Sequence, residues 1–284
     1  FGKYGFPESH AASFALLVYI SAWIKCHLPA AFYCGLLNAQ PMGFYTPSQL
    51  LQDAMRHDVE IRPIDVNSSE WFSTIEHGDN TPCIRLGFHL IKGLKAQSVN
   101  LLVSSRHSIF KNLNDFRSRT KLSVSDLEIL AGANAFRSLI ENRFESFWQI
   151  GDQESQLPLF QHIAHIEDDF KPRKPQLGER LVADYNTTGL SLEAHPMSLL
   201  RHKSAFQYCR KSSELLKLSK SPDRTIWVAG IVSTRQRPGS ASGVVFITLE
   251  DEDGQINCLV WPALVEKFRR EILVSQLLKV RGKI

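Results

Sequence analysis

The sequence predicts a multi-domain α plus β protein, mostly helical up to about residue 222 and ending in a small β-barrel. A long apolar run near the N-terminus has the character of a helix, and several capped amphipathic segments follow it. Regular strand alternation begins only at Thr225. With 284 residues, the chain has room for two or three small domains. Its hydrophobic content of 43% and charged content of 22% are ordinary for a globular protein.

The first predicted element is a helix that includes the uncharged run from Ala11 to Ile24. It is apolar on nearly every face and shorter than the roughly 20 residues that a bilayer requires, which predicts a helix buried in a core. Pro29 should end it, and Ser9 is a candidate N-cap. Because a helix N-terminus attracts anions, Ser9 and His10 lie where a phosphate could bind. A plain capping serine and a surface histidine are the alternative.

Two helices and a strand are predicted next. Residues 30–40 read as a helix, and Thr46-Pro47 supplies the cap and first turn of another that runs to about His57. Val59 to Ile64 is a short strand candidate, which Pro63 confines to a sheet edge. Asp65 to Ser69 is rich in turn-forming residues.

A helix, a tight turn at 92–95 and a second helix are predicted between Ile84 and Arg106. Gly93 would let the backbone approach a phosphate, with Lys92 and Lys95 beside it, as in a helix-hairpin-helix unit. An ordinary helical hairpin with solvated lysines is the alternative. A looser copy spans residues 115–139, with Ser123 as a cap and a new helix from Ala135. Four apolar residues are expected to close the core of this segment: Phe144, Phe147, Trp148 and Ile150.

Residues 151–178 read as a linker with three prolines, and residues 179–201 as a helix-turn segment in which His195 is structural. After Thr225, three predicted strands, a helix and a fourth strand follow the order of an OB-fold whose fifth strand is missing. OB-folds bind single strands through basic grooves and stacked aromatics, and Arg235, Arg237 and Lys279 or Lys283 could supply the charge. Phe246 and Trp261 are expected to be core residues, with stacking positions as the alternative.

The net charge of +4 is concentrated in two basic blocks. Residues 86–121 contain seven Lys or Arg and one acid, and residues 201–220 contain six and one. Such blocks suggest a polyanionic partner, although a solvated face gives the same pattern. The five cysteines form no C-x-x-C pair, which argues for reduced thiols in a cytoplasm and against a zinc site. No signal peptide or membrane span is expected.

The N-terminal sequence resembles the fingers region of bacterial C-family DNA polymerases, the family of the replicative polymerase III alpha subunit. The matching residues are Tyr4, Gly5, Phe6, Ser9, His10, Ala11, Ala12, Pro29, Ala30 and Phe32. Pro7-Glu8 and Phe14 replace the Asn-Lys and Tyr that are usual in replicative members, and this variant is similar to the error-prone branch of the family. Further segments that resemble this family occur at residues 65–69, 130–136 and 188–197.

This resemblance implies four regions: the end of the fingers (1–80), tandem helix-hairpin-helix units (81–150), a linker and connector (151–222), and an incomplete OB-fold (223–284). It also implies an internal fragment of a DNA polymerase for damage-induced and translesion synthesis, whose Mg²⁺-holding palm carboxylates lie upstream of this chain. Implied partners are primer-template DNA, deoxynucleoside triphosphates, a sliding clamp and mutasome accessory proteins.

The resemblance also assigns roles to individual residues. Lys3, Ser9, His10 and Phe14 would face the incoming nucleotide, and Lys92, Gly93 and Lys95 would grip the duplex. Arg235 and Arg237 would hold the single-stranded template. A non-catalytic DNA-binding adaptor with the same modules is the main alternative, and an RNA-binding OB module is a third.

Overall fold

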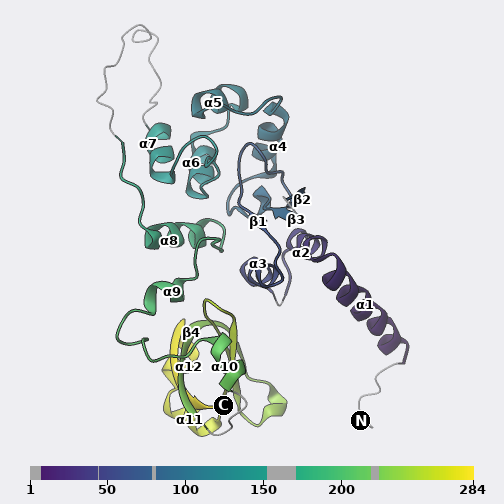
Figure 1. Cartoon of the computed structure of the whole chain (residues 1–284), viewed down its shortest axis with the longest axis vertical. Coiled ribbons are helices and arrows are strands. Elements are labelled where there is room, and N and C mark those ends of the chain that lie inside the picture. The colour runs from purple at the N-terminus through teal and green to yellow at the C-terminus, as the bar shows by residue number, and fades with distance from the viewer. Residues whose placement is uncertain (1–7, 44, 79–80, 152–170, 219–223) are drawn as a thin grey trace. The chain divides into compact units, whose positions relative to one another are not determined.

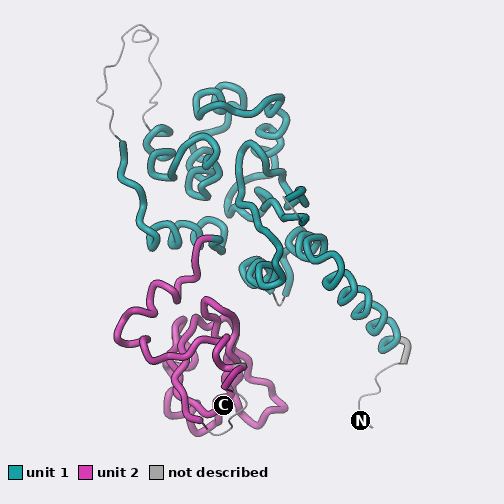
Figure 2. The backbone as a smooth tube through the Cα atoms, viewed as in Figure 1, with its two compact units in different colours: residues 1–192 teal, residues 193–284 magenta. Residues whose placement is uncertain are grey.

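The structure, a computed structural model, describes residues 8–43, 45–78, 81–151, 171–218 and 224–284. These fall into two compact units, residues 1–192 and residues 193–284, drawn in teal and magenta in Figure 2. Each unit has its own hydrophobic core. The predicted fold class, a helical region with helix-hairpin-helix character followed by an OB-fold, is confirmed.

The first unit combines helices with one small sheet (Figure 1). Its helices are α1 (Glu8–His27), α2 (Pro29–Asn38), α3 (Pro47–Arg56), the 3-10 turn η1 (Phe88–Leu90), α4 (Ala96–Ser105), α5 (Leu113–Thr120), α6 (Val124–Gly132), α7 (Arg143–Gly151) and α8 (Leu177–Thr187). Its strands are β1 (Ile61–Arg62), β2 (Thr74–His77) and β3 (Pro82–Arg85).

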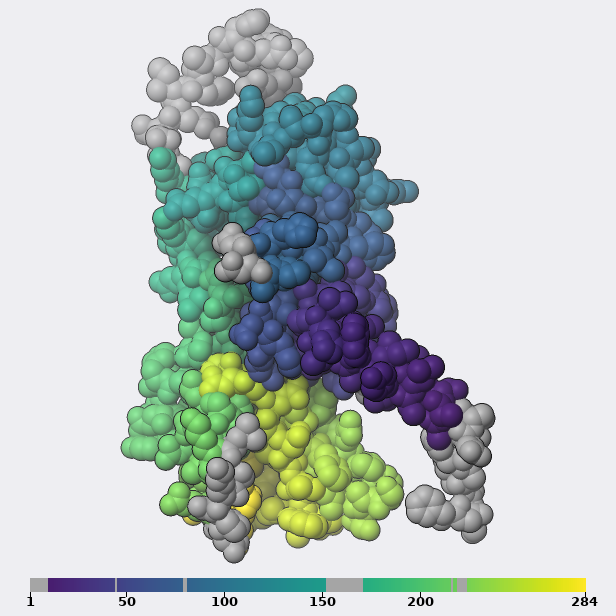
Figure 3. All heavy atoms as spheres, turned by 45° about the vertical axis from the view of Figure 1, so that its right-hand side comes forward, coloured from purple at the N-terminus to yellow at the C-terminus, as the bar shows by residue number. Residues whose placement is uncertain are grey.

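Helix α1 ends before Pro29, as predicted, but the prediction that it is a core helix is wrong for the described chain. The side chains of residues 10–23 are exposed; Leu16 and Tyr19, for example, keep 60% and 68% of their surface in solvent. Helix α1 packs mainly on α2 and extends away from it in Figure 1, and its purple atoms lie on the surface in Figure 3. The pattern of apolar residues shows that the faces of this helix are apolar. Whether the helix is buried depends on other elements that cover it, and a local pattern does not reveal them.

The predictions for residues 29–64 are confirmed. Helix α2 begins at Pro29, and α3 begins with a full capping box in which Thr46 and Gln49 each bond the other's backbone N–H. Strand β1 lies at an edge of the three-stranded sheet, whose order is β1-β3-β2. Pro63 directly follows β1, which is compatible with that edge position.

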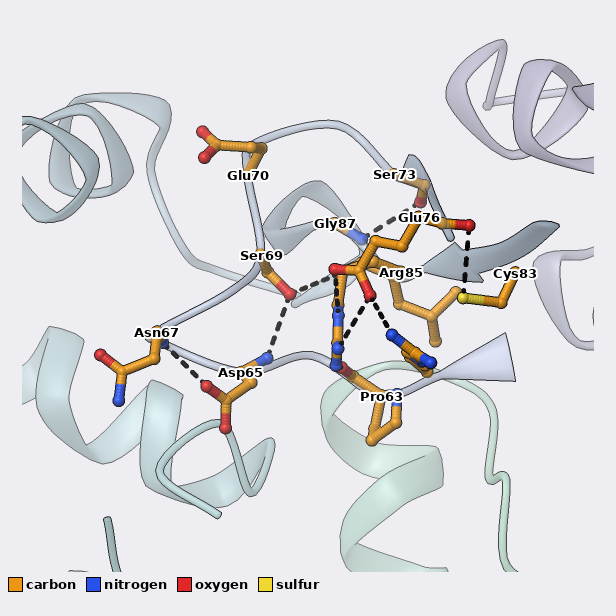
Figure 4. A network of polar contacts seen from close by, with 12 residues as sticks. Pro63, Asp65, Asn67, Ser69, Glu70, Ser73, Glu76, Cys83, Arg85 and Gly87 are labelled. Carbon is orange, nitrogen blue, oxygen red and sulfur yellow. Dashed lines mark hydrogen bonds and ion pairs between the residues drawn. The ribbon is translucent and has the colours of Figure 1, made fainter. Parts of the chain in front are cut away.

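An ionic network ties the sheet together (Figure 4). The Glu76 carboxylate on β2 accepts hydrogen bonds from Arg85 on β3 and Arg62 on β1 at 2.9–3.1 Å. The hydrogen bond from Arg85 is the main reason that the pKa of Glu76 lies below its ordinary value; burial opposes the shift and Arg62 adds to it.

The hairpin region departs from prediction at two points. Residues 82–85 form strand β3, and only the 3-10 turn η1 precedes the turn, so the predicted helix from Ile84 is wrong. Gly87 explains part of this, because a side chain there would meet the backbone of Trp71 and Phe72. Ser123 caps α6 as predicted, but residues 135–139 form turns rather than a helix. Of the four residues expected to close this core, only Ile150 is buried.

The expected linker lies largely in 152–170, outside the described residues. After it, α8 is held to α7 by the buried Arg143, whose guanidinium donates to Asp184 at 2.5 Å. The hydrophobic core of the first unit is continuous from Ala30 to Leu190. The four region boundaries therefore remain a prediction from the resemblance.

The second unit is a curled antiparallel sheet with short helices. Its elements are α9 (Pro196–Leu200), α10 (Ser212–Leu218), β4 (Thr225–Gln236), the 3-10 turn η3 (Gly239–Ala241), β5 (Val245–Glu250), β6 (Gln255–Val260), α11 (Pro262–Lys267), α12 (Arg269–Val274) and β7 (Leu277–Lys283). The strand order β6-β5-β4-β7 is that of the first four OB-fold strands.

The sequence anticipated most of this unit, including the hairpin turn at Asp253-Gly254. His195 has a structural role, as predicted: its Nδ1 caps α9 by accepting the Met197 N–H at 3.2 Å. Phe246 and Trp261, expected in the core rather than at stacking positions, keep 39% and 63% of their surface exposed, so this prediction is wrong. Neither is a core residue in the described structure.

Candidate nucleic-acid interface

The turn before α4 has the backbone that a phosphate-binding hairpin needs. Gly93 has φ +84°, a left-handed conformation that glycine adopts without strain. Lys95 follows as the N-cap residue of α4, with an extended backbone and an exposed side chain. The positive end of the α4 dipole and the Lys95 ammonium therefore lie at the same place.

Asp126 joins the N-termini of α4 and α6. Its Oδ2 accepts hydrogen bonds from Ser98 Oγ at 3.1 Å and from Ser123 Oγ at 2.8 Å. Lys95 is the N-cap residue of α4, and Lys121 lies two residues before the N-cap of α6. The two lysines therefore flank one region of the surface. Two helix N-termini and two exposed lysines give this region a positive potential, which Asp126 partly offsets.

Lys92 has a different partner from the one expected. Its ammonium donates to the carbonyls of Tyr185 and Asn186 at 3.1 and 3.3 Å, at the C-terminal end of α8. Its backbone N–H donates to Thr187 O at 2.9 Å. Lys92 thus caps α8, where a cation complements the helix dipole. Its predicted contact with DNA remains untested.

The first basic block separates into structural and available cations. Arg106 donates to the carbonyls of Val66 and Ser69 and pairs with Glu70, and Arg119 binds the carbonyls of Ser105 and Ser108. Apart from Lys92, three lysines of the block are exposed and form no ion pair with another described residue: Lys95, Lys111 and Lys121. Lys121 is a candidate for phosphate binding that the sequence did not indicate. Its place beside α4 becomes apparent only from the Asp126 hydrogen bonds that join the N-termini of α4 and α6.

In the second block, acids take up half of the charge. Arg201 pairs with Asp251 and Glu252, Lys211 with Glu252 and Asp253, and Arg210 with Glu214. Burial opposes ionisation of Glu252, but the hydrogen bonds from Arg201, a backbone N–H and Lys211 together outweigh it, so the pKa of Glu252 lies below its ordinary value. Half of this block is therefore structural.

The predicted nucleotide site is only partly described. Lys3 lies outside the described residues, and Ser9 falls within the first turn of α1 rather than before it. His10 and Phe14 lie on one face of α1, with their rings 4.3 Å apart and edge-on. These two residues do form one surface patch, and Phe14 keeps half of its surface exposed.

A polar cluster anchors the other end of α1. Asp53 Oδ2 on α3 accepts hydrogen bonds from Lys25 at 2.7 Å and from the Tyr33 hydroxyl at 2.6 Å. Burial, and then the Asp53 hydrogen bond, raise the pKa of Tyr33. Burial raises the pKa of Asp53 too, but the bonds from Lys25 and Tyr33 outweigh it, so the net shift is downward. The cluster fixes the base of the helix that carries His10 and Phe14.

Arg235 and Arg237 line a pocket of about 290 Å³ in the OB-fold, together with Gly243, Glu266 and Arg269. The Arg235 guanidinium donates to the carbonyls of Ile272 and Ser275, at the end of α12. It therefore ties β4 to that helix. Arg237 is exposed at the pocket.

Metal-ligand clusters and membrane-spanning helices are both absent from the described residues. No three His, Cys, Asp or Glu side chains lie together as ligands of a metal ion would. None of the helices in the described part of the chain combines the length and hydropathy needed to cross a membrane. The acidic residues 167–169 lie outside the description.

Comparisons with known proteins agree with the geometry. A family model described as a helix-hairpin-helix motif matches residues 58–146, and one described as an OB-fold nucleic acid binding domain matches residues 226–284. Proteins named error-prone DNA polymerase match the whole chain. The one from Teredinibacter turnerae is 48% identical over 288 residues, covering 100% of this chain and 28% of that protein.

The relative from Alkalilimnicola ehrlichii is 49% identical over 285 residues, covering 99% of this chain, and that from Pseudomonas savastanoi pv. phaseolicola is 46% identical over 290 residues. The chain spans 28% of the length of each of these relatives. Over its full length, the chain is therefore homologous to one segment of the proteins named error-prone DNA polymerase, and it contains a helix-hairpin-helix region and an OB-fold.

Proposed function

We propose that this chain is the DNA-holding segment of an error-prone DNA polymerase that extends primers across damaged template. The observation that carries the proposal is the whole-chain match to relatives with that name, combined with two nucleic-acid-binding modules in one chain. In this proposal the segment positions DNA and nucleotide, and carboxylates on another part of the polypeptide hold the Mg²⁺ ions that activate the primer 3′ oxygen. The partners would be primer-template DNA, deoxynucleoside triphosphates, a sliding clamp and accessory proteins, in a cytoplasm.

The helix-hairpin-helix region would bind duplex phosphates without reading bases. Gly93 allows a close backbone approach, and Lys95 and Lys121 flank the joined N-termini of α4 and α6. Cations and helix N-termini are the usual partners of phosphate oxygens, and they carry no sequence information. A polymerase that must accept any template requires this kind of contact.

Helix α1 would present the nucleotide-facing groups. His10 and Phe14 share one exposed helix face, and Lys3 and Ser9 precede or begin that helix in sequence. A histidine and an aromatic ring in contact offer a hydrogen-bonding group and a stacking surface to a nucleotide. Arg237 at the OB-fold pocket would contact the phosphates of the template strand.

The duplex contact can be tested with a pair of charge-removing substitutions. Lys95→Gln with Lys121→Gln should weaken binding of the 284-residue chain to a fluorescent primer-template. It should also reduce the slope of log Kd against log salt by about 1–2, because each lost phosphate contact removes roughly 0.9. Anisotropy titrations at several salt concentrations measure both quantities.

Arg56→Gln with Lys174→Gln is the matched control, because it removes two exposed charges from the same unit. The control pair should leave the slope unchanged. Equal slopes for the wild type and the Lys95/Lys121 variant, both binding DNA, would contradict the duplex assignment.

A further inference from the structure

The outer face of the β4–β7 strand pair carries an aromatic ring among cations. In the antiparallel register, Trp227 lies opposite Arg281, Ala229 opposite Lys279 and Thr225 opposite Lys283. Residues directly opposite one another project from the same face of a sheet. The residues between them, Val228 and Val280, pack into the core, so the charged face is the outer one. Met197 and Cys209 cover this face at Ala229, whereas Trp227 and Arg281 are exposed.

Trp227 keeps 39% of its surface exposed, and its ring makes cation–π contacts with two neighbouring cations. The Lys279 ammonium is 4.6 Å from the ring centroid, and the central carbon of the Arg281 guanidinium is 5.8 Å from it. Lys279 also donates to Ala205 O at 2.6 Å. The Arg281 guanidinium forms no hydrogen bond or ion pair with another described residue, so its donors are available to a ligand.

The two halves of the sheet differ sharply in charge. Strands β4 and β7 contain no Asp or Glu and four Lys or Arg, whereas β5 and β6 contain no Lys or Arg and include Glu250. OB-folds commonly bind oligonucleotides across their second and third strands, which here are β5 and β6. On this barrel, that face offers no cation from its strands to a phosphate.

We propose that the outer face of β4 and β7, centred on Trp227 and Arg281, binds single-stranded DNA. A base would stack on the exposed part of the Trp227 ring, and the flanking phosphates would pair with Arg281 and its neighbours. This inference rests on the proposed function, since it adds a second template contact on the barrel to the one proposed at Arg237.

Single-stranded nucleic acid fits this face better than an acidic protein segment does. Cations at alternate positions of one strand follow a repeating polyanion, and an exposed indole offers the stacking surface that unpaired bases require. Base stacking and phosphate contacts do not depend on the identity of the base, so binding should tolerate any sequence. An acidic peptide would match the charge but would leave the ring without a stacking partner.

The test uses the 284-residue chain, a fluorescent thymidine oligonucleotide and three variants. Trp227→Leu should weaken single-strand binding about tenfold, while Trp227→Phe should retain most of it. Arg281→Gln should reduce the salt slope by about 0.7, the amount expected for one phosphate contact on a single strand. Arg270→Gln, which removes an exposed charge from α12 in the same unit, should leave the slope unchanged.

The possible outcomes separate this inference from the proposed function. If the wild-type chain binds primer-template duplex and single strands, but the Trp227 and Arg281 variants bind single strands as the wild type does, the face is wrongly assigned. If these variants lose binding to an acidic peptide and keep binding to DNA, the occupant is a protein and the inference fails. If the wild-type chain binds neither form of DNA, the proposed function fails as well. Thermal unfolding of each variant checks folding, and Trp227→Phe and Arg281→Gln keep the test decisive if Trp227→Leu is unstable.

Discussion

At the scale of single residues, Lys92 and Lys95 show how one turn divides its charges between structure and binding. Lys92 caps α8, and Lys95 is exposed at the start of α4 without an ion pair to a described residue. The sequence places both lysines beside Gly93, but the carbonyls that bind Lys92 lie more than 90 residues further along the chain. Local pattern contains no information about a partner so distant in sequence.

Lys92→Ala should therefore lower the free energy of unfolding by about 1 kcal/mol, because the last carbonyls of α8 lose a charged donor at an exposed site. Lys95→Ala should leave stability unchanged and weaken DNA binding. Urea unfolding of both variants, alongside duplex titrations, separates the two roles. Equal losses of stability would show that Lys95 is structural too.

Glu76 makes the sheet of the first unit sensitive to acid. Its folded pKa lies below its ordinary value, so the unfolded chain binds the proton more readily. The stability it contributes is present above the unfolded pKa, about 4.3, and is lost as the pH falls through the lower folded value. Urea midpoints measured from about pH 6 to about pH 3 should fall less steeply for Glu76→Gln than for the wild type. Parallel curves would contradict this assignment.

At the scale of elements, the turn at Asp65 links parts of the chain that the sequence separates into two regions. Asp65 is 4% exposed, and its carboxylate accepts hydrogen bonds from the Asn67 and Ser138 backbone N–H groups and from Ser138 Oγ, at 2.8–3.1 Å. Asn67 in turn exchanges hydrogen bonds with the backbone of Phe110. The resemblance identified this turn as a motif, and the structure shows what it holds together.

Asp65→Ala should cost about 1–3 kcal/mol of stability, because it removes a buried carboxylate that accepts hydrogen bonds from Asn67 and Ser138. Chemical denaturation measures the change. Glu128→Ala, at an exposed position of α6, should stay within about 0.5 kcal/mol and serves as the control. A loss at Asp65 no greater than that at Glu128 would show that the turn does not bear on stability.

Elements whose signals are local were predicted well from the sequence. The Thr46 capping box, the Ser123 cap and the barrel strands all depend on neighbours a few residues away. The failures involve distant partners. Strand β3 forms because β1 and β2 pair with it, and α1 is exposed because nothing in the described chain covers its first turns. The available lysines could be identified only once the internal ion pairs were known.

At the scale of the whole molecule, the net charge of +4 does not show which cations are held in internal contacts and which are exposed. Internal ion pairs and carbonyl contacts take up Arg106, Arg119, Arg201 and Lys211. The exposed cations that remain include a lysine pair at the helix-hairpin-helix turn and a cationic face on the OB-fold. Such a distribution favours a polyanion that contacts each unit through a few phosphates.

The most direct test is the salt dependence of DNA binding by the unmodified 284-residue chain. Titrating it with a fluorescent primer-template carrying a single-stranded template overhang should give tight binding in dilute buffer. Log affinity should fall linearly with log salt, with a slope of about −0.9 for each duplex phosphate contact. A chain that fails to bind this DNA even at the lowest salt would contradict the account.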